Sequence, residues 1–288
     1  MPNRPTGDRS DLDDTALDDA ALATWYSYPA DTTALTPWLR ANFVSTLDGA
    51  VAGPDGRSGS INTAADRDAF ALLRALCDVI VVGAGTARAE AYGAAWVSPR
   101  WRDLRAAGGS GSRPAAPAMA VVSQSGTLPT PMLQPDLADG AGTVVLVTSG
   151  ACPRGALASA RDALGSDNVV VAGDGAVDLP LALAELAGRY GGRLLCEGGA
   201  RLLRQLVELE LLDEMCLTTV PRLVGGVSGR LVSGADLDVS LVPMALLEAD
   251  GALLGRWVMA DRLDRLGGQA ESRVRGAAGD LRPAGSPG

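Results

Sequence analysis

The stretch AADRDAFALLRALCDVIVVGAGT, residues 64–86, decides the fold class. Its first half places apolar residues at helical spacing between Phe70 and Leu76, which predicts a helix over 64–76. Its second half is a continuous apolar run, which predicts a fully buried strand over 78–83. A helix that leads directly into a buried strand is typical of α/β proteins.

The same alternation continues along the chain. Further strands are expected at 41–46, 118–123, 143–148, 168–173, 193–198 and 214–220, and helices from Pro153 to 164, over 179–190 and over 199–211. Two late apolar runs, 241–248 and 252–259, are expected to pair as a hairpin. The pattern predicts an α/β fold with a mixed, mostly parallel sheet flanked by helices. Residues 92–117 are predicted to form a long loop.

The two ends of the chain differ in composition from its middle. Residues 1–37 are acidic and polar, and residues 263–288 are rich in Gly, Ala, Arg and Pro, so both are predicted to be flexible tails. The folded domain is expected over 38–262.

The amino-acid composition narrows the range of expected binding partners and the expected cellular compartment of the protein. The net charge is −9 and there is no basic run, so neither nucleic acid nor a membrane surface is an expected partner. No segment has the length and apolarity of a membrane span, and the N-terminus lacks a secretory pattern. Four well-separated cysteines without a CxxC pair suit a reducing cytoplasm.

Two residue types are missing from the sequence. It contains no histidine, and all 25 basic residues are arginine. Catalysis by Ser-His-Asp or Cys-His, His-ligated zinc and phosphate-loop lysines are therefore excluded, and no metal site is expected. The chemistry must come from carboxylates, hydroxyls, arginines, backbone groups or a bound cofactor.

Two glycine motifs follow predicted strands. GAGT, residues 83–86, allows close backbone approach to a phosphate or ribose, or forms a plain turn. It is not a Rossmann fingerprint, because Arg88 stands where the third glycine would be. In CEGGARLL, residues 196–203, Gly198 and Gly199 would bare the N–H groups of a helix start for a pyrophosphate. Glu197 would lie at the carboxyl end of the sheet, facing a ligand or neutralising the helix start.

Two further segments carry polar side chains near strand and helix ends. In STLDGA, residues 45–50, Asp48 reads most simply as part of a turn. In RSGSINTAADR, residues 57–67, Thr63 is a predicted N-cap with Asp66 as its weak capping-box partner, and the same hydroxyls could meet a ligand.

The order of these motifs, more than any single one, carries a resemblance. The blocks LRANFVSTLDGAV (39–51), LLRALCDVIVVGAGTARAEAYG (72–93) and LLDEMCLTTVPRLVGG (211–226) are similar to the reductase domain of bacterial riboflavin biosynthesis, in particular to its stand-alone actinobacterial members. The resemblance covers Leu39 to Ala260. It implies a dihydrofolate-reductase-like fold, a homodimer, and NADPH-dependent reduction of 5-amino-6-(5-phosphoribosylamino)uracil, a phosphorylated pyrimidine.

The resemblance also assigns roles to individual residues. Positions that match cofactor-binding residues are Val44, Ser60, Gly83, Gly85, Thr86, Glu90, Gly198, Gly199, Ala200, Arg201, Leu202 and Leu203. Positions that match substrate-binding residues are Ser58, Arg74 and Glu197, and Asp48 matches an aspartate of the catalytic region. NADPH is expected across the carboxyl ends of the strands.

Hydride transfer to the ribose C1′ needs one proton source, and Asp48, Glu197 or a water that they orient would supply it. Burial beside a nicotinamide would raise the pKa of such a carboxyl group. Arg74 could bind a substrate phosphate or carboxylate. In the family, an arginine in the segment that follows the GAGT motif helps to hold the substrate phosphate. In this sequence that segment is AEAYGAAWVSPRWR, in which Arg100 or Arg102 is the candidate for the same role.

The residue that binds the 2′-phosphate and the class of protein both remain open. Arg88 and Arg154 are the candidates for the 2′-phosphate of NADPH. The protein could be a reductase of the same fold acting on dihydrofolate or another small molecule, or an inactive nucleotide-binding protein. A Rossmann dehydrogenase is disfavoured.

Overall fold

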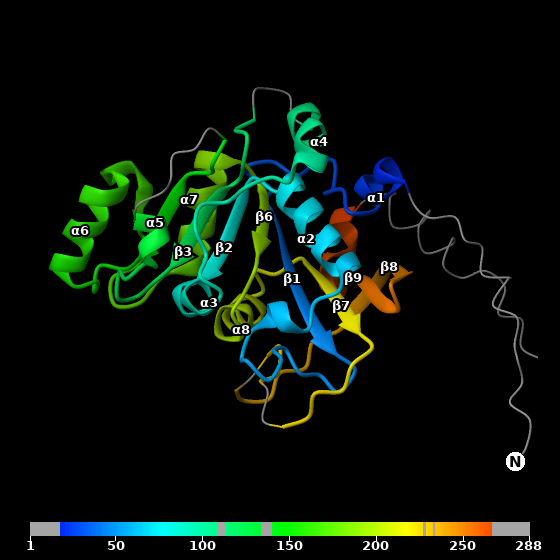
Figure 1. The fold of residues 1–288 in the computed structure, drawn as a ribbon. Helices are drawn as coiled ribbons and strands as arrows, with labels where there is room; N and C mark the ends of the chain where they lie inside the picture. The colour runs from blue at the N-terminus through cyan, green and yellow to red at the C-terminus, as the bar shows by residue number, and fades with distance from the viewer. Residues whose placement is uncertain (1–17, 109–112, 134–139, 227–228, 233, 267–288) are drawn as a thin grey trace, which may run out of the picture.

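A single mixed sheet organises the molecule. The computed structural model describes residues 18–108, 113–133, 140–226, 229–232 and 234–266, and within these the sheet has nine strands in the order β5-β4-β3-β2-β6-β1-β7-β9-β8 (Figure 1). The strands are β1 (Trp38–Thr46), β2 (Val79–Gly83), β3 (Ala118–Val122), β4 (Val144–Thr148), β5 (Val169–Val171), β6 (Arg193–Cys196), β7 (Glu214–Val220), β8 (Leu241–Ala249) and β9 (Ala252–Met259). Pairs from β5 to β7 are parallel, whereas β9 is antiparallel to β7 and β8. The expected fold class is confirmed.

Helices cover both faces of the sheet. They are α1 (Asp19–Trp25), α2 (Ala64–Leu76), α3 (Ala84–Ala89), α4 (Arg102–Ala107), α5 (Thr130–Leu133), α6 (Arg154–Leu164), α7 (Leu179–Tyr190) and α8 (Ala200–Glu208). Alternate residues of a strand point to opposite faces. Ile80 and Val82 therefore join the core with α2 and α6, while Val79 and Val81 join a second core with α7 and α8.

Local signals set the helix ends. Thr63 caps α2, and its hydroxyl accepts a hydrogen bond from the Asp66 N–H at 3.2 Å, as predicted. α7 begins after its N-cap Asp178 and ends at Tyr190, before Gly191, whose φ is +121°. α8 ends at Glu208, earlier than expected, because the chain turns at Glu210 with φ +53°.

Part of the predicted N-terminal tail belongs to the folded domain. Helix α1 starts at Asp19, and the following Tyr26 and Tyr28 are buried. The Tyr28 hydroxyl donates to the Leu194 carbonyl of β6 at 3.0 Å, and the Arg40 guanidinium lies over its ring. A boundary at residue 37 is therefore too late, because two aromatic side chains in a polar stretch suffice to anchor it. Residues 1–17 lie outside the described residues.

The C-terminal boundary also shifts. A 3-10 segment, Ala260–Leu266, runs past residue 262, and Leu266 is buried. Arg265 pairs with Asp213 and donates to the Pro37 carbonyl at 2.7 Å. Residues 267–288 lie outside the described residues.

The predicted loop 92–117 contains structure. A 3-10 turn, Pro99–Trp101, leads into α4, and Trp101 is buried. The buried Arg105 guanidinium donates to the carbonyls of Ala75 and Cys77 at 3.1 and 2.7 Å. It thereby satisfies carbonyls that the end of α2 leaves unpaired.

A buried charge cluster joins three neighbouring strands. Glu214 of β7 accepts hydrogen bonds from Arg40 of β1 at 2.9 Å and from Arg256 of β9 at 2.6 Å, and all three side chains are at most 4% exposed. Burial acts against the charge of Glu214, but Arg256 and Arg40 outweigh it and hold its pKa at about 2.

Within the described residues, no helix is long and apolar enough to cross a bilayer.

Candidate active site

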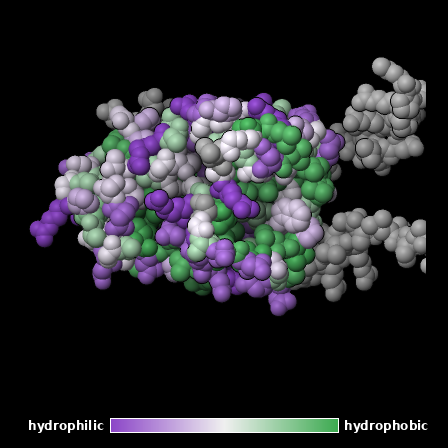
Figure 2. Space-filling model, turned by 90° about the horizontal axis from the view of Figure 1, so that it is seen from below, coloured by the Kyte–Doolittle hydropathy of each residue, from purple (hydrophilic) through white to green (hydrophobic). Residues whose placement is uncertain are grey.

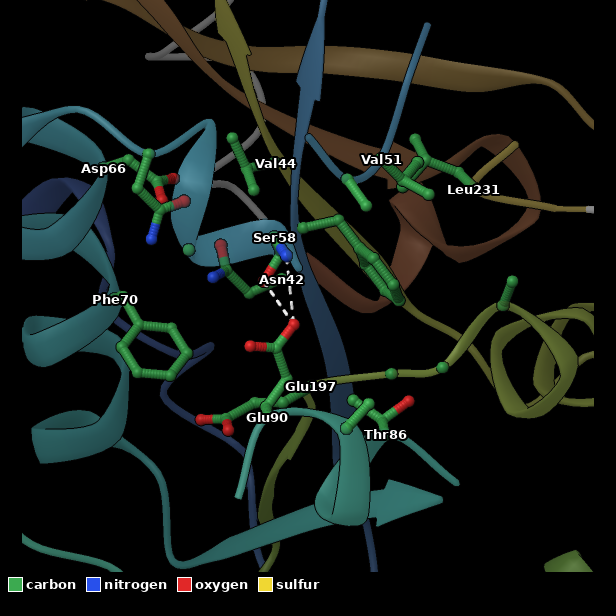
Figure 3. Close-up of a pocket in the computed structure, with 18 of the residues that line it drawn as sticks. Asn42, Val44, Val51, Ser58, Asp66, Phe70, Thr86, Glu90, Glu197 and Leu231 are labelled. Carbon is green, nitrogen blue, oxygen red and sulfur yellow. Dashed lines mark hydrogen bonds between the residues drawn. The ribbon is translucent and has the colours of Figure 1, made fainter. Parts of the chain in front are cut away.

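A cavity of about 400 Å³ lies beside the carboxyl ends of β2 and β6, against the middle of β1. Its described lining comes from β1, the segment 51–62, α2, α3, the link from β6 to α8, and Leu231. Figure 3 shows Asp66 and Phe70 projecting from α2 on one side, with Thr86 of α3 on the other. The carboxyl edge of the strands is where open α/β sheets bind ligands.

The two glycine motifs meet at this cavity. β2 and β6 are parallel neighbours, with Val81 opposite Cys196, so the motifs that follow them are adjacent. The Gly83 N–H donates to the Gly198 carbonyl at 2.8 Å. Motifs more than a hundred residues apart thus form one rim of the site.

The Gly198–Gly199 link depends on the absence of side chains. Gly198 has φ +104°, which favours glycine, and its peptide bond to Gly199 is cis. A Cβ at Gly199 would lie 2.5 Å from the Thr86 hydroxyl oxygen. Gly199 is also the N-cap of α8, and no side chain caps this helix start. Its N–H groups are therefore available to an anion in the cavity.

Glu197 and Arg74 form a bidentate ion pair in the wall of the cavity. Arg74 Nε and Nη2 each donate to one oxygen of Glu197 at 2.7 Å. The Glu197 side chain is 1% exposed and that of Arg74 is 17% exposed. The Arg74 guanidinium also lies over the rings of Phe70 and Tyr92, at 4.3 and 5.3 Å. Arg74, expected to bind the substrate, pairs with the carboxylate that lines the site and is not itself among the residues that line the cavity.

A second contact closes the cavity wall. The Ser58 N–H and hydroxyl both donate to Glu90 Oε1 at 3.0 Å, which joins the segment before α2 to the end of α3. Ser60 is exposed, and its hydroxyl donates to Asp55 and to the Arg57 carbonyl. Ser60 therefore serves the local turn and does not line the cavity.

Asp48 lies outside the cavity lining, where the loop after β7 binds its carboxylate. Its carboxylate accepts the Thr46 hydroxyl and the N–H groups of Val224 and Gly225, the latter two at 3.0 and 2.7 Å. The Thr46 hydroxyl, and then the Gly225 N–H, lower the pKa of Asp48. The pKa of Asp48 is lowered, not raised, because the carboxylate is exposed and accepts several hydrogen bonds. Asp48 fastens the turn after β1 to the loop after β7 and is not among the residues that line the cavity.

Comparison with known proteins identifies the family of this domain. Residues 37–251 match the RibD C-terminal domain. The chain belongs to this family. A 2,5-diamino-6-ribosylamino-4(3H)-pyrimidinone 5′-phosphate reductase of Methanothermobacter thermautotrophicus is 33% identical over 205 residues, which are 71% of this chain and 87% of the relative. A reductase with the same name from Archaeoglobus fulgidus is 30% identical over 193 residues, or 67% and 84% of the two chains.

A solved structure confirms the expected fold of the RibD C-terminal domain. The pyrimidine reductase-like protein of Corynebacterium diphtheriae is 25% identical, with a TM-score of 0.66 over 78% of this chain and 92% of that one. Acinetobacter baumannii RibD shares the fold at 19% identity, with a TM-score of 0.60 over 79% and 60% of the two chains. The resemblance found in the sequence is therefore confirmed at the level of family and fold.

The positions expected to bind the cofactor or the substrate in this RibD-type domain are only partly found in the cavity lining. Eight of the expected site residues line the cavity, namely Val44, Ser58, Thr86, Glu90, Glu197, Gly198, Gly199 and Ala200. Gly83, Gly85 and Arg201 do not appear in that lining. Leu202 and Leu203 are buried in the core beneath α8, because the apolar face of this helix packs on the sheet. Their side chains hold the helix in place and leave only their backbone to a ligand.

The arginines considered for anions also lie away from the RibD-type cavity. Arg100 is paired with Asp19 and Asp68 on the surface, and Arg102 borders a separate cavity beside α4. Arg88 and Arg154 are exposed on α3 and α6. The described lining of the cavity contains three carboxylates and no arginine. Within the cavity, the groups best suited to a negative group of a ligand are therefore the backbone N–H groups at the start of α8.

Sequence reasoning missed several polar residues of this site. Asn42, Asn62 and Asp66 line the cavity, with Phe70 and Tyr92. The sequence predicts Asp66 only as the capping-box partner of Thr63, whereas in the structure it forms part of the cavity wall (Figure 3). No sequence signal distinguishes the two roles, since acidic residues are common in the first turn of helices. Among the described residues, no cluster of three potential metal-ligating side chains occurs.

Proposed function

We propose that this RibD-family protein is an NADPH-dependent reductase of riboflavin biosynthesis that reduces the ribose C1′ of a phosphorylated ribosylaminopyrimidine. One observation carries the proposal: a single cavity joins an uncapped, glycine-lined helix start to a wall of hydrogen-bonding side chains from β1 and α2. The names of the two archaeal relatives support the same reaction class.

The residues at one end of the cavity fit a nicotinamide dinucleotide. Gly198 and Gly199 leave space beside Thr86 that a side chain would fill, and the start of α8 offers N–H groups to a pyrophosphate. Phe43 supplies an apolar surface next to this end, because a Cβ at Gly198 would lie 3.3 Å from its ring. The reduced nicotinamide, when bound, supplies the hydride. NADPH is favoured over NADH by the family resemblance, and the exposed Arg88 and Arg201 are candidates for its 2′-phosphate.

The opposite end of the cavity suits the pyrimidine. Asn42, Asn62 and Asp66 offer hydrogen-bonding groups, and Phe70 offers an apolar surface to a flat ring. Glu197 can accept a further hydrogen bond from the ribosylamine, because a carboxylate has lone pairs beyond the two that Arg74 uses. Arg74 and Glu197 would thus position the carbon that receives the hydride. The bond from C1′ to the ribose ring oxygen would break, and the freed oxygen would take a proton from a solvent water molecule.

Steady-state kinetics test the proposal. NADPH oxidation is measured with 5-amino-6-(5-phosphoribosylamino)uracil, with its 2-amino-pyrimidinone counterpart and with dihydrofolate. Turnover with either pyrimidine and none with dihydrofolate is the expected result. Turnover with dihydrofolate alone overturns the substrate class. NADPH binding seen by calorimetry without reduction of any of the three would identify an inactive nucleotide-binding protein instead.

The expected homodimer is also part of the proposal. β8 is an edge strand of the sheet, and the exposed side chains of its hairpin with β9 include Leu241, Leu246 and Leu253. In Figure 2, hydrophobic residues gather on the side of the molecule that carries this hairpin. Exposed edges and apolar patches of this kind suit a partner. Sedimentation velocity is expected to show a dimer, and a monomer at micromolar concentration would refute it.

A further inference from the structure

A second cavity, of about 390 Å³, lies beside α4. Its described lining includes Trp96, Arg102, Asp103, Arg105 and Arg113. Figure 1 shows α4 at the end of the sheet opposite α3 and α8, which border the candidate active site. A ligand in the second cavity would therefore bind apart from the reactants of the proposed reaction.

The second cavity differs in charge from the candidate active site. Its described lining has three arginines and one carboxylate, that of Asp103, whereas the described lining of the active site has three carboxylates and no arginine. Asp78 bonds Arg113 at 2.5 Å and so offsets part of the positive charge. The chain as a whole has a net charge of −9. A gathering of arginines around one cavity of so acidic a chain points to an anionic ligand.

Arg105 supplies a buried donor that the fold does not use. The residue is 3% exposed, and its Nε and Nη1 donate to three backbone carbonyls. Its Nη2 has no hydrogen-bond partner among the described residues and, unlike Arg40 Nε, is not an enclosed atom, so it is accessible from the cavity. Burial, and then the charge of Arg113, lower the pKa of Arg105 to about 10. An anion beside Nη2 would act against both effects.

Arg113 presents further donors to the same space. Its side chain is 10% exposed, and its Nη2 donates to Asp78 and to the carbonyls of Leu76 and Cys77. Its Nε and Nη1 have no partner in the part of the chain that the structure describes. Arg102 is exposed at the rim of the cavity. Three guanidinium groups can thus share the oxygens of one phosphate.

An aromatic side chain stands beside these arginines. Trp96 is 42% exposed and lines the cavity together with Val97, Pro114 and Ala115. A flat ring can stack on the exposed indole. The volume of the cavity falls within the range of roughly 300–1,000 Å³ that is typical of small-molecule sites.

We propose that the second cavity binds a phosphate monoester that carries a flat ring, such as a mononucleotide, with Arg102, Arg105 and Arg113 on the phosphate. Trp96 stacks on the ring, and the exposed Asp103 can accept hydrogen bonds from hydroxyl or amino groups of the ligand. This site goes beyond the proposed function and does not depend on it.

Titration calorimetry with AMP, adenosine and inorganic phosphate tests the proposal. Each titration is run with and without an excess of NADPH, which would displace AMP from the candidate active site but not from the second cavity. AMP is expected to bind in both conditions, at least about 10-fold more tightly than adenosine, because adenosine lacks the charged phosphate.

Three variants locate the site. R102M is expected to weaken AMP about 3- to 10-fold, and because Arg102 is exposed its loss should leave the fold intact. W96L should weaken AMP about 5-fold or more and leave the affinity for inorganic phosphate unchanged, because only the ring loses its contact. R161M, which removes an exposed arginine of α6 away from the cavity, is the matched control and should change neither affinity.

Three results would overturn the site. They are the absence of AMP binding, the displacement of AMP by NADPH, and an equal AMP affinity in the wild type, R102M and W96L.

Discussion

Replacing Glu197 by glutamine removes a negative charge from the cavity wall and nearly preserves the shape of the side chain. Arg74 would keep one acceptor where it now has two at 2.7 Å. Breaking a buried ion pair by changing one partner costs about 3–5 kcal/mol. Arg74 is 17% exposed and stacks on two rings, so some solvation of its charge remains and the lower end, about 3 kcal/mol, is expected.

A double-mutant cycle isolates the pair. Urea unfolding of E197Q, R74M and the double variant at neutral pH should give a coupling energy of about 2–3 kcal/mol, because either single change leaves the other group unpaired. Glu185→Gln is the matched control. Its pair with Arg189 is one-third exposed on both sides, so a loss below about 0.5 kcal/mol is expected.

The same variants report on function. E197Q is expected to lower kcat with either pyrimidine substrate by at least about 10-fold, while the dissociation constant of NADPH changes by less than about 3-fold. A coupling energy below about 0.5 kcal/mol would show that the pair does not stabilise the cavity wall. Unchanged turnover in a folded E197Q enzyme would show that the pair does not position the substrate.

Three further outcomes are expected. Gly199→Val should raise the NADPH dissociation constant by about 10-fold or more, because even its Cβ would lie too close to the Thr86 hydroxyl. Gly175→Ala, where a Cβ meets open space, should leave that constant unchanged. Titration calorimetry with NADPH measures both variants. Asp48→Ala should speed hydrogen exchange at the Gly225 amide, which loses its acceptor, and should leave NADPH affinity unchanged; equal exchange rates would refute the anchoring role. Glu214 has a folded pKa of about 2 against an ordinary 4.5, so its stabilisation is present above about pH 4.5 and is lost as pH falls toward 2. Glu214→Gln should cost about 3–5 kcal/mol at neutral pH and flatten the acid limb of a urea-unfolding series; a curve parallel to the wild type would contradict the buried cluster.

Secondary structure was largely predictable where local forces dominate. The helix over 64–76 and the helix over 179–190 have the predicted bounds, because apolar spacing and end residues agree there. The predictions failed at residues 18–37 and 92–117, where isolated aromatic and arginine side chains in polar stretches dock onto distant elements. Local patterns carry no record of such docking.

The sequence by itself determined the family and the α/β class, since the order of several motifs and the alternation of helices and strands are local features of the chain. It also predicted that the glycine motifs after β2 and β6 form a ligand-binding edge. Only the tertiary structure decided which carboxylates serve the cavity. Asp48 is tied to the loop at 224–225, Glu197 is paired with Arg74, and Asp66 enters the wall. Each orientation depends on a partner brought close by strand pairing or helix packing, and such long-range contacts leave no periodic signal in the chain.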